Sequence, residues 1–179
     1  SDVRVITQAV YRFNDAGYLD PKRRRHIWRI AVPGGGEPKQ LTSGSFDETN
    51  PSWSPDGKDI YFTSNRVKES YYEPPDTDIY AIPSGGGEMK KVLSIDGIIG
   101  DFSFSRDGKL IAFRGTANGR PARSYSQPDL FVADAIAGAT TRNLTAKYDF
   151  DVGSGLTADQ HPPRANQSGG VIWNKDGRT

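Results

Sequence analysis

The chain has 179 residues, enough for one domain with a buried core. Hydrophobic residues make up only 35%, and the 20 glycines and 12 prolines favour many short strands joined by tight turns. The 23 basic and 22 acidic residues leave a net charge of +1, which gives no electrostatic reason to expect binding to nucleic acid or to an anionic membrane surface. Cysteine is absent, so disulfides, thiolate metal sites and cysteine catalysis are excluded.

The first elements in chain order are three strands. An alternating pattern predicts a strand over Val3–Phe13, and an apolar run predicts one over Ile27–Val32. A short strand that ends in Leu41 and Thr42 is expected over Lys39–Thr42. We interpret Asn14–Arg25, between the first two, as an insert. The chain opens on a strand without a methionine, so we expect it to be a piece of a longer protein and assign it no compartment, cytoplasmic or periplasmic. No apolar run approaches the length of a membrane span, and membrane insertion is not expected.

The next element is a β-hairpin around the turn Ser54–Gly57. Pro55 fixes φ for the first central position of the turn, and Gly57 accepts the positive φ with which such turns end. After the turn, Ile60 and Phe62 alternate with polar or half-polar neighbours at the period of a strand. Similar Asp-Gly turns recur at residues 106–109 and 175–178.

The turns belong to a repeat of 51 residues. Asp56 and Asp107 lie 51 residues apart, and the same step places Asp78–Ile82 on Asp129–Ala133. A step of 52 residues carries that block back to His26–Ile30. Each unit contains four predicted antiparallel strands, which is typical of a propeller blade. Helical repeats are the alternative, but the period-2 alternation and the glycine-rich turns argue against them.

We therefore predict an all-β fold, a partial β-propeller with about three blades' worth of strands. Its predicted parts are a blade lacking its first strand (1–42), two full blades (51–93 and 102–145), a loop insert (146–170) and the first strand of a further blade (171–179). We predict the insert because the last Asp-Gly turn comes 69 residues after the previous one, and not 51. Loops as long as this insert are usually functional or disordered. Open blade edges also predict self-association, in which the last strand of one copy completes the first blade of another.

Two sets of residues resemble known families. Asn50–Lys58, followed by Ile60–Phe62, resembles the TolB-type, WD40-like (PD40) propeller repeat. Gly17–Asp20 together with His26–Trp28, and Tyr148–Gly153, resemble segments of prolyl-oligopeptidase-family (S9) serine peptidases of the acylaminoacyl-peptidase and dipeptidyl-aminopeptidase branch. The resemblance spans nearly the whole chain.

This resemblance implies a non-catalytic propeller that gates the access of short peptides to a separate α/β-hydrolase domain. The implied partners are that hydrolase domain of the parent chain and its peptide substrates. The sequence contains no G-x-S-x-G nucleophile motif, so no catalytic residue is assigned, and no cofactor or metal is expected. The alternative is a TolB-like protein-interaction propeller without enzymatic activity.

Three residues are candidate substrate contacts. Asp47 and Glu48 form a carboxylate pair in a connection that crosses toward the predicted ring axis, where it would bind a peptide's amino terminus. The simpler interpretation is a solvated turn before Pro51. His161 lies in the loop insert and would face a substrate path, whereas His26 is interpreted as a residue at the start of a strand.

Two further charged stretches have simpler explanations. The basic run Lys22–Arg25 would suit an acidic partner domain or a peptide carboxylate, but a solvated loop is favoured because no aromatic residues interleave it. Asp76 and Asp78 lack the further acidic positions and the glycine of a calcium loop, and are interpreted as the start of a strand.

Overall fold

The computed structural model describes residues 3, 5–7, 9–14, 17–20, 22–68, 71–119, 126–149, 152 and 170–177. Every regular element in this part of the chain is a β-strand. Among these residues no helix occurs that is long and apolar enough to cross a membrane.

The middle of the chain forms a four-stranded antiparallel blade, here called the middle blade. Its strands are β5 (Thr49–Trp53), β6 (Asp59–Asn65), β7 (Thr77–Pro83) and β8 (Lys90–Leu93), paired in chain order. β6 and β7 are the interior strands, and their side chains alternate so that both faces of the blade carry apolar residues. Both faces must therefore be covered by neighbouring blades.

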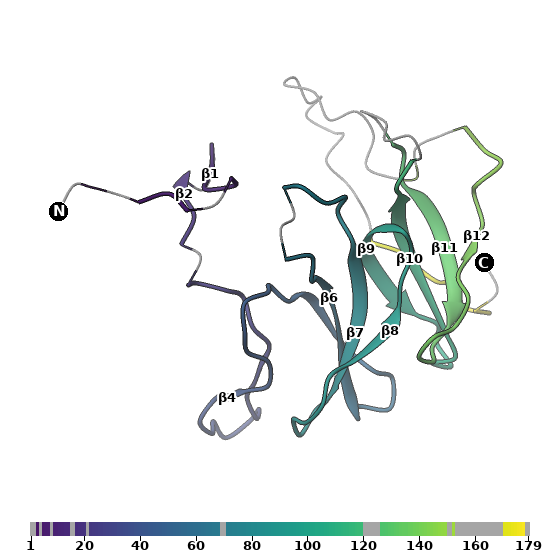
Figure 1. Ribbon diagram of the computed structural model, residues 1–179. Coiled ribbons are helices and arrows are strands. Elements are labelled where there is room, and N and C mark those ends of the chain that lie inside the picture. The colour runs from purple at the N-terminus through teal and green to yellow at the C-terminus, as the bar shows by residue number, and fades with distance from the viewer. Residues whose placement is uncertain are drawn as a thin grey trace, which may run out of the picture.

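The last blade repeats this arrangement with β9 (Gly97–Phe104), β10 (Leu110–Ala117), β11 (Asp129–Asp134) and β12 (Arg142–Asn143). A single parallel pair of residues, Thr77 and Ile98, links β7 to β9. Through this one pair the strands join into a single eight-stranded sheet in the order β12-β11-β10-β9-β7-β6-β5, with β8 beside β7. The two blades lie side by side (Figure 1). This arrangement confirms the predicted fold, a partial propeller of four-stranded antiparallel blades.

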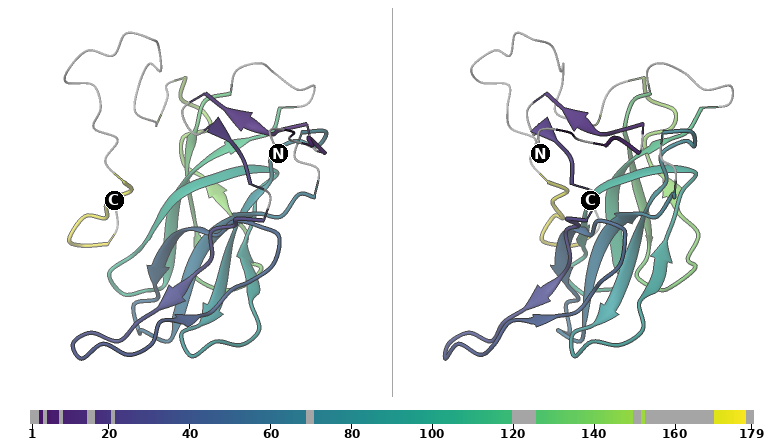
Figure 2. Two further views of the ribbon diagram at one scale, coloured as in Figure 1. Left: turned by 90° about the vertical axis from the view of Figure 1, so that its left-hand side faces the viewer. Right: turned by 60° about the vertical axis from the view of Figure 1, so that its left-hand side comes forward.

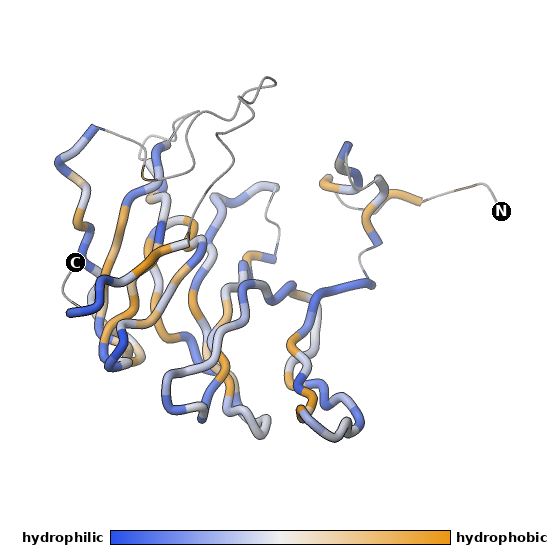
Figure 3. Tube along the Cα trace, turned by 180° about the vertical axis from the view of Figure 1, so that it is seen from behind, coloured by the Kyte–Doolittle hydropathy of each residue, from blue (hydrophilic) through white to orange (hydrophobic). Residues whose placement is uncertain are grey.

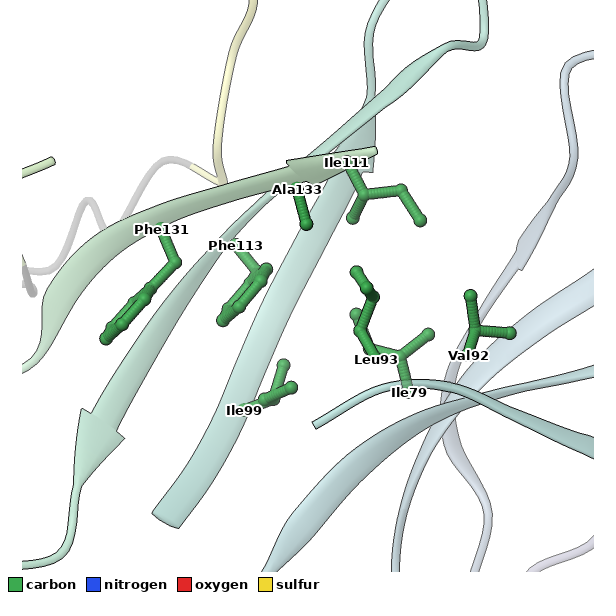
Figure 4. Close-up of a cluster of buried hydrophobic side chains, with 8 residues drawn as sticks. All are labelled: Ile79, Val92, Leu93, Ile99, Ile111, Phe113, Phe131 and Ala133. Carbon is green, nitrogen blue, oxygen red and sulfur yellow. The ribbon is translucent and has the colours of Figure 1, made fainter. Parts of the chain in front are cut away.

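The interface between these blades is the larger of two hydrophobic cores. Figure 4 shows side chains from β7 and β8 meeting side chains from the last blade. Phe113 and Phe131 are stacked with their ring centroids 5.2 Å apart. The cluster consists of Ile79, Val92, Leu93, Ile99, Ile111, Phe113, Phe131 and Ala133.

The first blade contributes two paired strands, β3 (Trp28–Arg29) and β4 (Lys39–Gln40). Ile27, just before β3, is buried against the middle blade in a second core with Ile60, Phe62, Tyr80 and Ile82. The predicted third and fourth strands of this blade are therefore present, although shorter than expected.

The described residues of Val3–Phe13 do not form the predicted strand. Among them, β1 (Arg12–Phe13) alone is a strand, and it pairs with β2 (Gly17–Tyr18) instead of β3. The hairpin lies to one side of the blades in Figure 1, and the views of Figure 2, turned toward that side, show it in front of them. Figure 3 shows hydrophobic residues near the N-terminus standing away from the blades. Val3 and Val5 are 80% and 79% exposed.

Asn14–Arg25 is not an insert. The corresponding connections, residues 66–76 between β6 and β7 and residues 118–128 between β10 and β11, are of nearly the same length. A connection of this length is therefore a regular part of each blade.

Val171–Trp173, predicted as the first strand of a further blade, lies along β9 without forming a strand of its own. The Ser103 hydroxyl donates to the Val171 carbonyl at 2.8 Å, and Trp173 Nε1 donates to the Ser103 carbonyl at 3.2 Å. Asp101 Oδ2 accepts a hydrogen bond from the Val171 N–H at 3.2 Å.

Candidate functional site

The predicted carboxylate pair lies at a charged junction between the first and middle blades. We define this junction by His26, Thr42, Asp47, Glu48 and Arg66. They come from the start of β3, the end of the β4 segment, the connection before β5 and the end of β6. A backbone hydrogen bond of 2.9 Å from Glu48 N to the Arg25 carbonyl holds the two connections together.

The Glu48 side chain is fully enclosed at the centre of this junction. Its Oε2 accepts a hydrogen bond from the Thr42 hydroxyl at 2.8 Å and is hydrogen-bonded to His26 Nδ1, also at 2.8 Å. Its Oε1 accepts a hydrogen bond from Arg66 Nη2 at 2.7 Å. A buried carboxylate needs such partners, because burying an unpaired charge is strongly unfavourable.

The Arg66 guanidinium is held between two aromatic rings. It lies 5.2 Å from the ring centroid of Phe46 and 4.9 Å from that of Tyr80. These distances are within the range of cation–π interactions, which are stronger where water is excluded. Arg66 thereby connects the end of β6 to Glu48 and fixes the entry into β5.

Asp47 neutralises part of the basic run. Its Oδ1 accepts a 2.7 Å hydrogen bond from the Arg25 backbone N–H, and its Oδ2 lies 3.3 Å from Arg24 Nη1. Burial raises the pKa of Asp47, but the Arg25 hydrogen bond and the charges of Arg24 and Arg25 outweigh it and lower the pKa overall. Arg24 and Arg25 are thus paired with a carboxylate of the same chain.

The junction has no arrangement for covalent catalysis. The hydrogen-bond partner described for the His26 ring is a carboxylate, not a hydroxyl. The Thr42 hydroxyl donates to Glu48 and accepts a 2.8 Å hydrogen bond from the Ile27 N–H. Nucleophilic catalysis requires a nucleophile within hydrogen-bond reach of its base, and these contacts do not provide one.

Equivalent positions in the other blades are also polar and bonded. Asp129, at the place of His26, accepts a 2.6 Å hydrogen bond from the Thr145 hydroxyl, and the Leu130 N–H donates to the same hydroxyl at 3.0 Å. In the middle blade, Asp78 pairs with Lys91. Burial raises the pKa of Asp78, and the Lys91 hydrogen bond and charge partly offset this effect. A polar side chain therefore anchors the start of the third strand in every blade.

The candidate contacts are placed very differently by the structure. Glu48 is enclosed, which fits neither a solvated turn nor an open subsite, whereas 34% of the Asp47 side chain is exposed. His161 lies outside the described residues. We did not predict from the sequence that His26, Thr42 and Arg66 contribute to this junction. The one signal available for it was the polar residue that recurs before the third strand of each blade.

Two open cavities adjoin these blades. One of about 450 Å³ lies between the first and middle blades and is lined by His26–Ile30, Pro51–Trp53 and Ile60. The other, of about 440 Å³, is lined by residues of the β6–β7 connection, of β8 and of the link into β9, among them Glu73, Asp76, Lys91 and Asp96. No group of three His, Asp or Glu side chains in the described part of the chain is arranged to hold a metal ion.

Comparison with known protein families identifies the family of this propeller. Residues 8–120 match the model of the dipeptidyl peptidase IV (DPP IV) N-terminal region. The chain belongs to this family. The predicted resemblance to the propellers of S9 peptidases is therefore confirmed.

Two peptidases are among the relatives of this member of the DPP IV N-terminal region family. The uncharacterized peptidase YuxL of Bacillus subtilis is 32% identical over 151 residues, which cover 84% of this chain and 21% of that protein. Dipeptidyl-peptidase 5 of Porphyromonas endodontalis is 26% identical over 141 residues, covering 79% of this chain and 19% of that protein. The chain thus spans about a fifth of the length of these relatives.

Among solved structures, TolB from Acinetobacter baumannii is similar to this chain, with 26% sequence identity and a TM-score of 0.47. The match covers 65% of this chain and 26% of the TolB chain.

Proposed function

We propose that this chain is a non-catalytic part of the propeller of a serine peptidase, and that the propeller gates the access of short peptides to a separate α/β-hydrolase domain. The observation that carries the proposal is the match of residues 8–120 to the N-terminal region of a dipeptidyl peptidase. The two relatives, both named as peptidases, support it because each is about five times longer than the matched segment.

The contacts between blades support a gating role. A gate that selects by size must keep its opening constant, so its blades must resist separation. The middle and last blades share a hydrophobic core, and the first and middle blades share a smaller core together with the junction around Glu48. Packed interiors of this kind have low compressibility.

Within this proposal, Asp47, Glu48 and His161 remain the predicted substrate contacts. Of the two carboxylates, Asp47 is the one that a peptide amino group would reach without rearrangement, because Glu48 is enclosed. A peptide amino group would compete there with Arg24 and Arg25.

The test is a series of peptides offered to the full-length parent protein. The peptides share one scissile sequence and increase in length, and a stably folded protein carrying the same sequence in a surface loop ends the series. We expect kcat/KM to fall steeply beyond a threshold length and the folded protein to remain uncut. Equal rates along the series, including the folded protein, would contradict gating.

A further inference from the structure

Asn118 joins two connections at one end of the blades. It directly follows Ala117, the last residue of β10, and is only partly buried. Its Nδ2 donates to Asp96 Oδ1 at 3.0 Å and to the Pro75 carbonyl at 3.3 Å. Its backbone N–H donates to the Asp96 carbonyl at 2.8 Å. Asn118 therefore ties the link into β9 to the β6–β7 connection, across the boundary between the middle and last blades.

This tie is not a feature of every blade. The 51-residue step places Val67 at the position of Asn118 in the middle blade, and a valine side chain cannot donate a hydrogen bond. The tie also borders the cavity of about 440 Å³, which Asn118 lines together with three acidic residues and Lys91. A change in the charge of residue 118 would therefore act on a cavity that already carries several charges.

Asn118 is followed by Gly119, and this pair has the chemistry of a deamidation site. In deamidation the backbone nitrogen of the next residue attacks the side-chain carbonyl carbon of asparagine, a cyclic succinimide forms and ammonia leaves. Water then opens the succinimide to aspartate or isoaspartate. Glycine favours the attack, because no Cβ shields its nitrogen and its backbone is conformationally permissive. Asn118 is the one asparagine of the sequence that precedes a glycine.

The structure leaves the attacking nitrogen available. Gly119 lies beyond the end of β10, and within the described residues its N–H donates to no other group. The hydrogen bonds of the Asn118 amide are exposed, so water can reach the site. Asn143 provides a contrast, because its amide also donates to an aspartate, Asp129, at 2.8 Å, but Leu144 follows it. Of these two asparagines, Asn118 alone has an unhindered neighbour.

We propose that Asn118 is a deamidation site, and that its conversion to a carboxylate releases the tie between the two connections. The new carboxylate cannot donate a hydrogen bond to Asp96 or Pro75, so both acceptors lose a partner. It also places a second negative charge next to the Asp96 carboxylate, where like charges repel. The β6–β7 connection then becomes free to move away from the link into β9. This inference concerns a chemical change of the chain and does not depend on the proposed peptidase function.

Incubation of the folded 179-residue polypeptide in neutral buffer over several weeks tests the first half of the proposal. Peptide mapping by mass spectrometry should show the mass gain of an NH₂-to-OH exchange at Asn118 and none at Asn143, the internal control. Gly119→Ala should slow the conversion by at least about tenfold, because the added methyl group hinders the attack. The proposal would be overturned by equal rates at the two asparagines. It would also be overturned if the folded chain stays unconverted while a urea-unfolded sample converts completely.

Hydrogen exchange tests the second half. Asn118→Asp reproduces the deamidated side chain, and Asn118→Ala removes the same donors without adding a charge. We expect backbone amides at residues 71–76 and 94–96 to exchange about tenfold faster in Asn118→Asp than in the unmodified protein, with a smaller increase in Asn118→Ala. The aged protein should follow Asn118→Asp, and high salt should reduce the difference between the two variants because it screens the repulsion from Asp96. Equal exchange in all samples would mean that the tie holds nothing in place, which would overturn the proposal.

Discussion

At the scale of single residues, Glu48 is the most consequential side chain of the structure. Its carboxylate is enclosed and hydrogen-bonded to His26, Thr42 and Arg66. Removing one member of a buried charged pair leaves the other charge buried without a partner. This destabilises a protein far more than replacing the whole pair by apolar residues does. The first and middle blades should therefore separate more readily when Glu48 is lost.

We predict that Glu48→Ala lowers the free energy of unfolding by about 3–5 kcal/mol, because Arg66 would lose its buried counter-charge. Urea denaturation followed by circular dichroism measures this loss. Glu37→Ala is the matched control, since Glu37 is exposed in the connection before β4 and its loss should change stability by less than about 0.5 kcal/mol. Equal effects of the two substitutions would contradict the buried junction.

A second prediction concerns the repeated turn. Asp56 accepts hydrogen bonds from the Ser54 hydroxyl at 2.7 Å and the Lys58 N–H at 3.1 Å, and these bonds lower its pKa below the usual value of 3.8. Because the pKa is lower in the folded state, the stabilisation is present above pH 3.8 and is lost as the pH falls through the lowered value. Asp107 has the same contacts with Ser105 and Lys109.

NMR titration of the aspartate carboxyl carbons should show both residues titrating below pH 3.8. Ser54→Ala should raise the pKa of Asp56 and leave that of Asp107 unchanged, so that the second turn serves as an internal control. An unchanged Asp56 pKa in this variant would contradict the assigned hydrogen bond.

The sequence indicated part of the junction but not its geometry. The pair Asp47–Glu48 stood out because two carboxylates are adjacent, yet its partners His26 and Arg66 lie 22 and 18 residues from Glu48 in sequence. Long-range pairing of this kind depends on how two blades pack, and the spacing within one repeat contains no information about it.

At the scale of strands, the repeat predicted the middle and last blades well. The 51-residue step placed each hairpin correctly, because alternation, turn residues and spacing all point to the same structure. It failed for Val3–Phe13, since alternation predicts an extended segment but does not say which strand it pairs with. The first blade lacks a neighbour on that side, so nothing in the structure holds this segment against β3.

The two Asp-Gly turns offer a matched test of packing between blades. Gly57 and Gly108 both have φ of 72°, but a Cβ at Gly57 would meet nothing within 4 Å, whereas one at Gly108 would lie 3.1 Å from Cγ of Pro55. Each glycine-to-alanine change should cost about 1 kcal/mol for the positive φ. We predict a measurably larger loss for Gly108→Ala by urea denaturation. Equal losses would mean that the two turns do not pack against each other.

At the scale of the whole molecule, the isolated 179-residue polypeptide exposes several large apolar side chains. Trp28, Ile30 and Trp53 are all more than half exposed on the side of the first blade, and Ile172 is 84% exposed beside the last blade. We predict that the polypeptide self-associates, which light scattering coupled to size-exclusion chromatography would show as a mass that rises with concentration. A single monomeric mass across the concentration range would contradict this prediction.

The central proposal is that this propeller is part of a serine peptidase whose catalytic serine lies elsewhere in the parent protein. Labelling the full-length parent with a serine-reactive fluorophosphonate, followed by peptide mapping, tests it most directly. We predict one labelled serine outside these 179 residues and no labelling of the isolated polypeptide. A labelled serine within these residues, or a parent protein that does not react at all, would contradict the claim.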